Sequence, residues 1–160
     1  FLPAGKGFQW LRSRILKTPE PEFLRELEAT GARLALLVRS MKAQRGASAV
    51  MVAGFSQGGH LAWYLAARGV VDGAVIASGA LPPSFAVSRP PRKVLLRYVS
   101  GVEDKTVPWE VVRTTSGKFR DAGYEVQGRQ LKASHSLPGV GYSFAQLLDE
   151  VVVRLIEPGR

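Results

Sequence analysis

The sequence has no cysteine and only two histidines among its 160 residues. Without cysteine there are neither disulfide bonds nor thiolate metal sites, and two histidines far apart in the chain argue against a histidine-rich metal site. We therefore expect no metal and no cofactor. No unbroken apolar run is long enough to cross a bilayer, so we also expect no membrane span.

Acidic residues are in the minority: 13 Asp and Glu stand against 22 Lys and Arg, which gives a formal net charge of +9. The basic residues are scattered, and neither a helix-turn-helix pattern nor an arginine-rich run accompanies them. The nearest approach to a cluster, Arg89–Lys93, fits a solvated loop before a strand. We therefore expect no nucleic-acid partner, although the charge favours a weak attraction to anionic substrates or surfaces.

Apolar residues make up 46% of the chain, enough to form a core, and we interpret residues 1–160 as a single domain. Short apolar runs that resemble buried strands alternate with helical patterns, which predicts an α/β fold with a mostly parallel sheet and helices on both faces. The expected strands are 49–53, 74–78, 93–99 and 124–131. Helices are expected from Thr18–Pro21 to Gly46, over 61–67, from Trp109 to Gly123, and over 147–155, where Glu157-Pro158-Gly159 ends the last one.

The segment Gly54-Phe55-Ser56-Gln57-Gly58-Gly59 lies between the first strand and the following helix. Gly-x-Ser-x-Gly at a strand–turn–helix junction is typical of a nucleophile elbow, in which a strained backbone projects the serine hydroxyl above the sheet. We expect a Cβ at Gly54 or Gly58 to clash where helix and strand converge. The alternative is an ordinary turn in which Ser56 is a helix N-cap.

A nucleophilic serine needs a base and an acid, which follow in the order Ser, Asp or Glu, then His in the α/β-hydrolase arrangement. His135 stands in a loop-like stretch after the last strand and is the candidate base, whereas we interpret His60 as a polar residue near a helix start. Asp104, in the turn after strand 93–99, is the candidate acid. Glu103 is its neighbouring rival, and Asp121 sits too deep in the following helix.

Four segments together resemble the phospholipase/carboxylesterase family, small α/β-hydrolases that include the acyl-protein thioesterases. They are Gly54–Gly59, Ser78-Gly79-Ala80-Leu81-Pro82, Gly101-Val102-Glu103-Asp104-Lys105-Thr106-Val107-Pro108, and His135. The resemblance runs from about Pro3 to the C-terminus. It implies Ser56 as nucleophile, His135 as general base and acid, Asp104 as its orienting partner, and the backbone N–H of Gln57 as one oxyanion donor.

The chain departs from the family at its beginning. Family members are longer there, with early strands and a His-Gly loop that provides a second oxyanion donor, and this chain starts at Phe1 without them. We expect a fragment whose nucleophile strand, including Met51, is left as an apolar sheet edge. Such an edge favours a homodimer or a strand-swapped assembly. We expect a cytoplasmic location, with secretion left open because the expected fragment would lack its true start.

The resemblance implies a serine carboxylesterase or thioesterase that hydrolyses short- to medium-chain acyl esters, with a small ester or acyl lipid as substrate. Leu81, Trp109 and Leu137, expected in loops, are candidates for lining an acyl pocket, though each fits a core position equally well. The alternative is a non-catalytic fragment that acts only with a partner chain. A third interpretation, a dienelactone-hydrolase-like enzyme, would require cysteine where Ser56 stands.

Overall fold

The computed structural model describes residues 2–4 and 7–157, and a parallel four-stranded sheet forms its centre. In spatial order the strands are β3 (Met51–Phe55), β4 (Gly73–Ala77), β5 (Leu95–Gly101) and β6 (Glu125–Leu131). A short antiparallel pair, β1 (Leu2–Ala4) with β2 (Gly7–Gln9), lies apart from this sheet. The α/β architecture predicted from the sequence is confirmed.

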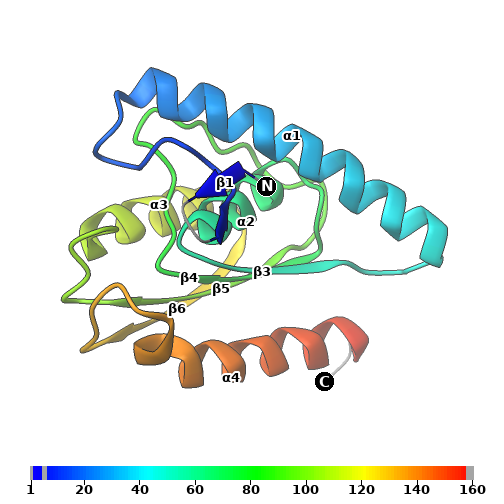
Figure 1. The fold of residues 1–160 in the computed structure, drawn as a ribbon. Helices are drawn as coiled ribbons and strands as arrows, with labels where there is room; N and C mark the ends of the chain where they lie inside the picture. Colours follow the sequence, from blue (N-terminus) through cyan, green and yellow to red (C-terminus); the bar gives the residue numbers. More distant parts are fainter. Residues whose placement is uncertain (1, 5–6, 158–160) are drawn as a thin grey trace.

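Helices cover both faces of the sheet (Figure 1). Helices α2 (Gln57–Ala67) and α3 (Trp109–Asp121) pack on one face, and α1 (Glu20–Arg45) lies outside α2. Helix α4 (Leu137–Ile156) covers the opposite face. Because parallel strands all end at the same edge of a sheet, the loops that follow β3, β5 and β6 lie close together, and these loops carry the candidate site residues.

The first strand begins at Met51, two residues later than expected, and continues through Phe55. The physical reason is a bond that the sequence does not show. The backbone N–H of Val50 donates to the Asp72 carboxylate at 2.9 Å, so this residue is tied to the turn before β4. Elsewhere the expected strands shift by one or two residues, and α1 ends as predicted at Gly46, which is left-handed with φ 59°.

Helix α4 begins ten residues before the segment 147–155 in which the sequence analysis placed it. Pro138 and Gly139 look unfavourable for a helix, but proline is tolerated in the first turn, where its missing N–H is not needed. Ser136 caps the helix, and its hydroxyl accepts from the Gly139 N–H at 3.3 Å. The helix ends at Ile156, and Pro158 and Gly159, which were expected to end it, lie outside the described residues.

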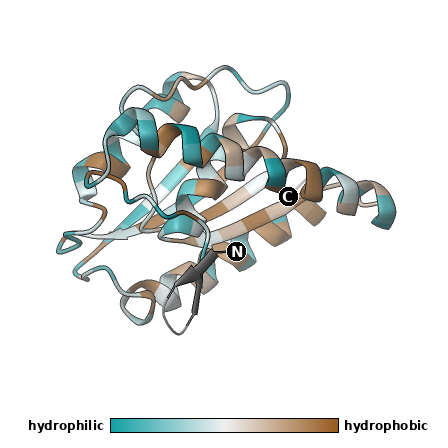
Figure 2. Cartoon of the chain, turned by 45° about the horizontal axis from the view of Figure 1, so that its top comes forward, coloured by the Kyte–Doolittle hydropathy of each residue, from teal (hydrophilic) through white to brown (hydrophobic). Residues whose placement is uncertain are grey.

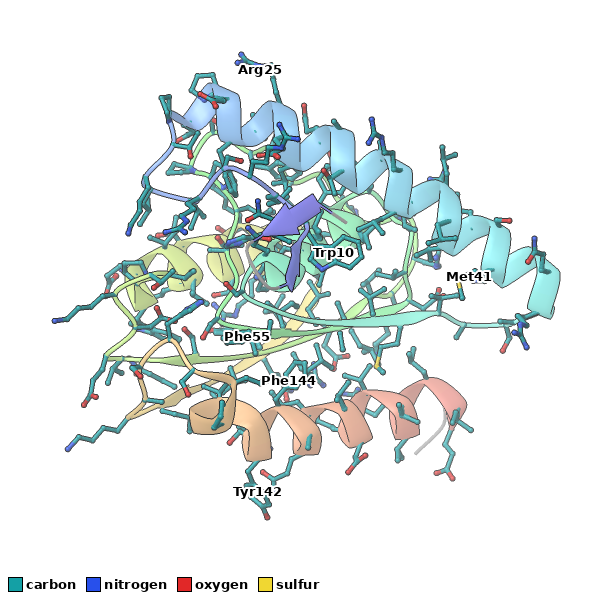
Figure 3. All side chains as sticks on the ribbon, viewed as in Figure 1. Trp10, Arg25, Met41, Phe55, Tyr142 and Phe144 are labelled. Atoms are coloured by element: carbon teal, nitrogen blue, oxygen red, sulfur yellow. The ribbon has the colours of Figure 1, made fainter. Side chains whose placement is uncertain are left out.

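The sheet separates two apolar cores, and alternate residues of its strands contribute to each. Ala74, Ile76, Leu96 and Tyr98 face α2 and α3, whereas Val75, Ala77, Leu95 and Val99 face α4. Figure 2 shows the central strands mainly in hydrophobic colours. On α4, Phe144 points toward the sheet while Tyr142 points away from it (Figure 3).

A charged residue lies within the second core. Arg97 in β5 has no exposed surface, and its guanidinium contacts Glu125 at 2.9 Å and Glu150 at 2.5 Å. Glu125 also binds Arg154 and Lys93, so three cationic side chains contact this one carboxylate. A buried charge is tolerated when it is paired in this way.

The outer edge of β3 is only partly covered. β3 pairs with β4 on one side, and in residues 2–4 and 7–157 no strand pairs with its other side. Met51 and Val52 are half-buried and Ala53 is exposed. Within the same residues, none of the helices is both long enough and apolar enough to cross a membrane.

Candidate active site

Ser56 stands at the sharp junction between β3 and α2, in a backbone conformation that non-glycine residues rarely adopt. Its φ is 54° and its ψ is −114°. Strain of this kind persists only where the surroundings enforce it, and it is common at reactive side chains. The tight turn brings Gly54 against the helix start, where an added Cβ would lie 2.1 Å from the Gly58 carbonyl oxygen.

The expected crowding at Gly58 is wrong, because a Cβ there would meet nothing within 4 Å. The second tight position is Gly59 instead. A Cβ on Gly59 would lie 3.0 Å from Cα of Gly79, and one on Gly79 would lie 2.5 Å from Gly59. These two glycines let the start of α2 approach the end of β4 closely.

Ser56, His135 and Asp104 form a continuous row of hydrogen bonds. His135 Nε2 lies 2.8 Å from Ser56 Oγ, and His135 Nδ1 lies 2.8 Å from Asp104 Oδ2. The other Asp104 oxygen accepts from the backbone N–H groups of Thr106 and Val107 at 2.9 and 2.8 Å. The Asp104 side chain has no exposed surface, whereas that of His135 is 20% exposed, so the row leads from the interior toward solvent.

His135 is held by its position in the chain and by a ring contact. It directly precedes Ser136, the N-cap of α4, and thus sits where the loop after β6 is fixed by the helix. Its ring packs on Phe55 with centroids 5.0 Å apart. Phe55 is the last residue of β3 and immediately precedes Ser56, so one strand end positions both partners of the hydrogen bond.

The alternatives weighed in the sequence analysis lie elsewhere. Glu103 is exposed beside His135, and the carboxylate that bonds to the ring is that of Asp104. Asp121 is the exposed last residue of α3.

His60 lies near the start of α2 as expected, but it is buried, which the sequence analysis did not anticipate. Its Nδ1 is 2.7 Å from the Ala80 carbonyl oxygen and 3.0 Å from the Ala80 nitrogen, so it shares a hydrogen bond with this residue in either tautomer. Burial lowers the pKa of His60 from 6.5 to about 4, and the ring is therefore neutral near pH 7.

Gln57 contributes to this region through its backbone N–H and, separately, through its side chain. It is the first residue of α2, so its backbone N–H has no acceptor within the helix. Its side chain turns away to the preceding segment. Oε1 accepts from the N–H groups of Trp10 and Leu11 at 2.9 and 3.2 Å, and Nε2 donates to the Leu11 carbonyl at 2.7 Å.

We call residues 9–18 the strap, because they pass over the start of α2 before α1 begins. Glu26 of α1 provides its second anchor, accepting from the N–H groups of Arg12 and Ser13 at 2.7 Å and from the Ser13 hydroxyl. Burial alone would raise the pKa of Glu26, but these hydrogen bonds hold it below its usual value. Leu11 and Ile15 of the strap are buried in the first core.

A cavity of about 290 Å³ opens between the strap and Ser56. Ser56, Gln57 and His60 form one wall, and Thr106 and Val107 of the loop that carries Asp104 form another. Strap residues complete it. Among the residues that the structure describes, no group of three His, Asp or Glu side chains is arranged to hold a metal ion.

A sequence profile of the phospholipase/carboxylesterase family matches residues 24–147, which is most of the chain. The chain belongs to the phospholipase/carboxylesterase family. No significant match is found among curated protein sequences.

Solved structures of similar fold include family members with low sequence identity. The phospholipase/carboxylesterase from Dyadobacter fermentans superposes with a TM-score of 0.73 at 21% identity, over 90% of this chain and 71% of that one. The carboxylesterase from Mesorhizobium loti gives 0.70 at 19% identity, over 92% and 71%. Acyl-protein thioesterase 2 from Zea mays gives 0.59 at 17% identity, over 87% and 70%. At these identities the likeness establishes the α/β-hydrolase fold.

The three candidate pocket residues of this phospholipase/carboxylesterase family member do not line the cavity at Ser56. Leu81 is buried in the loop after β4 and borders a separate hollow beside α3. Trp109 is the half-buried first residue of α3, against Tyr98. Leu137, expected in a loop, is the first residue of α4 and is exposed. The strap lines this cavity instead, and it could not be predicted because a segment without hydrophobic periodicity gives no signal of what it covers.

Proposed function

We propose that this protein is a serine carboxylesterase or thioesterase that hydrolyses short- to medium-chain acyl esters through an acyl-enzyme. The observation that carries the proposal is the row from Ser56 to His135 to Asp104, with both hydrogen bonds at 2.8 Å. Membership of the phospholipase/carboxylesterase family and the esterases among the structural neighbours support the same chemistry.

In this mechanism His135 Nε2 takes the Ser56 proton as Oγ attacks the acyl carbonyl. Asp104 accepts from Nδ1–H and stabilises the imidazolium that forms. The Gln57 N–H donates to the tetrahedral oxyanion, and the imidazolium then gives its proton to the departing alcohol or thiol. His135 then takes a proton from water as the water oxygen attacks the acyl-Ser56 ester. The intermediate collapses to the free acid, and His135 returns the proton to Ser56 Oγ. The cycle uses side chains of this chain and needs no cofactor.

The test is hydrolysis of p-nitrophenyl butyrate, measured beside a Ser56→Ala variant. Removing the nucleophile should lower kcat by about 10⁴-fold or more. A fluorophosphonate probe should add its mass at Ser56 in the unaltered chain and fail to label the variant. Equal hydrolysis by both proteins would refute the proposal, because the activity would then not pass through Ser56.

A second candidate is a domain that acts only with a partner chain, and the partly covered edge of β3 favours it. An edge with free backbone groups and apolar side chains is a template for a further strand. This candidate predicts that the chain self-associates or depends on an added segment. Light scattering after gel filtration measures the self-association. A monodisperse monomer that hydrolyses the ester by itself would exclude it.

A further inference from the structure

The cavity beside Ser56 has an uneven distribution of charge. The strap contributes Arg14 and Lys17 to its lining, and no acidic side chain lines it in the described part of the chain. His60, on the opposite wall, is neutral near pH 7. The charged side chains around this cavity are therefore both cationic.

Neither cation is neutralised by a neighbour. In residues 2–4 and 7–157, Arg14 and Lys17 form no ion pair, and both are exposed at the mouth of the cavity. Two carboxylates close to the cavity are already engaged: Glu26 holds the backbone of Arg12 and Ser13, and Asp104 holds His135. The positive charge at the mouth is thus available to a ligand.

The backbone that carries the two cations is fixed. Gln57 and Glu26 anchor the strap at one end, and the turn itself is closed by the N–H groups of Lys17 and Thr18, which donate to the Arg14 carbonyl at 3.1 and 2.9 Å. The Arg14 N–H donates in return to the Thr18 hydroxyl at 2.9 Å. A rigid backbone keeps both side chains within reach of the same cavity, which favours recognition over non-specific attraction.

The position of His135 indicates which part of a substrate enters this cavity. In the proposed function His135 protonates the leaving group, so that group must lie beside it. His135 borders a different hollow, shared with Glu103, Lys105 and Ser134, and does not line the cavity under the strap. The leaving group therefore occupies the hollow of mixed charge, and the acyl group occupies the cationic cavity.

We propose that the cavity under the strap selects acyl groups that end in an anion, such as the half-ester of a dicarboxylic acid, and that Arg14 and Lys17 bind this anionic end. The inference rests on the proposed function for the direction of the acyl chain. It goes beyond the family assignment, because the family profile begins at residue 24 and the strap lies before it.

The experiment compares mono-p-nitrophenyl adipate with p-nitrophenyl hexanoate, which share chain length and leaving group and differ in the terminal charge. We expect the ratio of kcat/KM for adipate to that for hexanoate to fall about two- to fivefold in Arg14→Gln or Lys17→Gln. In the double variant it should fall about tenfold, mainly through KM. Raising the ionic strength should weaken the preference of the unaltered protein.

Arg25→Gln is the matched control, because Arg25 is exposed on the outer face of α1 and points away from the site (Figure 3). It removes the same charge and should leave the ratio unchanged. An unchanged ratio in the double variant, or an equal fall in the control, would overturn the proposal. A comparison of 4-acetoxybenzoate with phenyl acetate places the anion on the leaving group, and a strap-dependent preference there would overturn the acyl assignment.

A binding measurement separates this inference from the proposed function. Calorimetric titration of Ser56→Ala with adipate does not depend on turnover, and Arg14→Gln/Lys17→Gln in the same background should weaken the affinity about tenfold. Binding through the strap without hydrolysis by the unaltered protein would contradict the esterase function alone. Hydrolysis of the neutral ester without strap-dependent binding would contradict the anion preference alone.

Discussion

Two hydrogen-bonded groups of ionisable side chains lie beside β5, and they end differently. One runs from Asp104 through His135 to Ser56, and the other joins Arg97 to Glu125 and Glu150. Each contains a charged side chain with no exposed surface. The first, which we call the open group, ends at the Ser56 hydroxyl in the wall of a cavity. In the second, which we call the closed group, each charged side chain faces one of opposite charge.

The comparison shows that a perturbed pKa does not by itself mark a reactive site. Burial alone would raise the pKa of Glu125, but hydrogen bonds from Arg97, Lys93 and Arg154 bring it from 4.5 down to about 2. A carboxylate with a pKa this low is a poor base, and Glu125 does not line the cavity at Ser56. A better criterion for a reactive site is a hydrogen-bonded group that ends at a nucleophile in a cavity and that includes a strained backbone.

The largest effect on activity should come from substituting Asp104, the buried end of the open group. Asp104→Asn keeps an oxygen for the N–H groups of Thr106 and Val107 but removes the charge that stabilises the His135 cation. We expect kcat for p-nitrophenyl butyrate to fall about 10³- to 10⁴-fold, with little change in KM. Steady-state kinetics on the folded variant measure this.

Asp121→Asn is the matched control, since it makes the same substitution on the exposed end of α3. It should change kcat less than about twofold. If Asp104→Asn retained most of the activity, the role of Asp104 as the partner of His135 would be wrong, and exposed Glu103 would become the next carboxylate to test.

Breaking the closed group should affect stability instead of catalysis. Arg97→Ala leaves Glu125 and Glu150 without their buried partner and opens a cavity in the second core. We expect it to lower the free energy of unfolding by about 3 kcal/mol, measured by urea denaturation. The kcat/KM per folded molecule should stay within about twofold. A loss of turnover without a loss of stability would connect this network to the site and remove the distinction.

The open group was accessible to sequence reasoning because its residues follow strands. Parallel strands end at one edge, so Ser56 after β3, Asp104 after β5 and His135 after β6 could be brought together from their order alone. Their geometry agrees with the expectation, and their catalytic roles stay a prediction. The fold class followed from the same alternation of strand and helix patterns.

The closed group was out of reach because its partners are set by tertiary packing. Arg97 and Glu150 lie 53 residues apart in the sequence. Hydrophobic periodicity does not predict that α4 packs over β5. A charge inside the apolar run 93–99 was the available signal. The Gln57 side chain was missed for a similar reason, since its partners Trp10 and Leu11 are 47 and 46 residues away.

His60 sharpens the comparison as a third case, an ionisable group that borders the site but is buried without a counter-charge. Its pKa of about 4 in the folded state lies below the 6.5 of an ordinary histidine, so between these values the unfolded chain binds a proton that the folded chain does not. The contribution of neutral His60 to the free energy of unfolding is therefore fully present above about pH 6.5. It falls as the pH is lowered, and about 3 kcal/mol of it is lost at pH 4.

Urea denaturation at a series of pH values tests this. A His60→Gln variant should lose the slope between pH 6.5 and 5, where the carboxylates with lowered pKa values, such as Glu125 and Glu26, do not yet titrate. An acid loss below pH 4.5 should persist in the variant, because Glu26 and Glu125 take up protons there on unfolding, whereas the loss due to His60 is nearly complete by pH 4. If the slope above pH 5 survived the substitution, His60 would not be the neutral buried group that the structure describes.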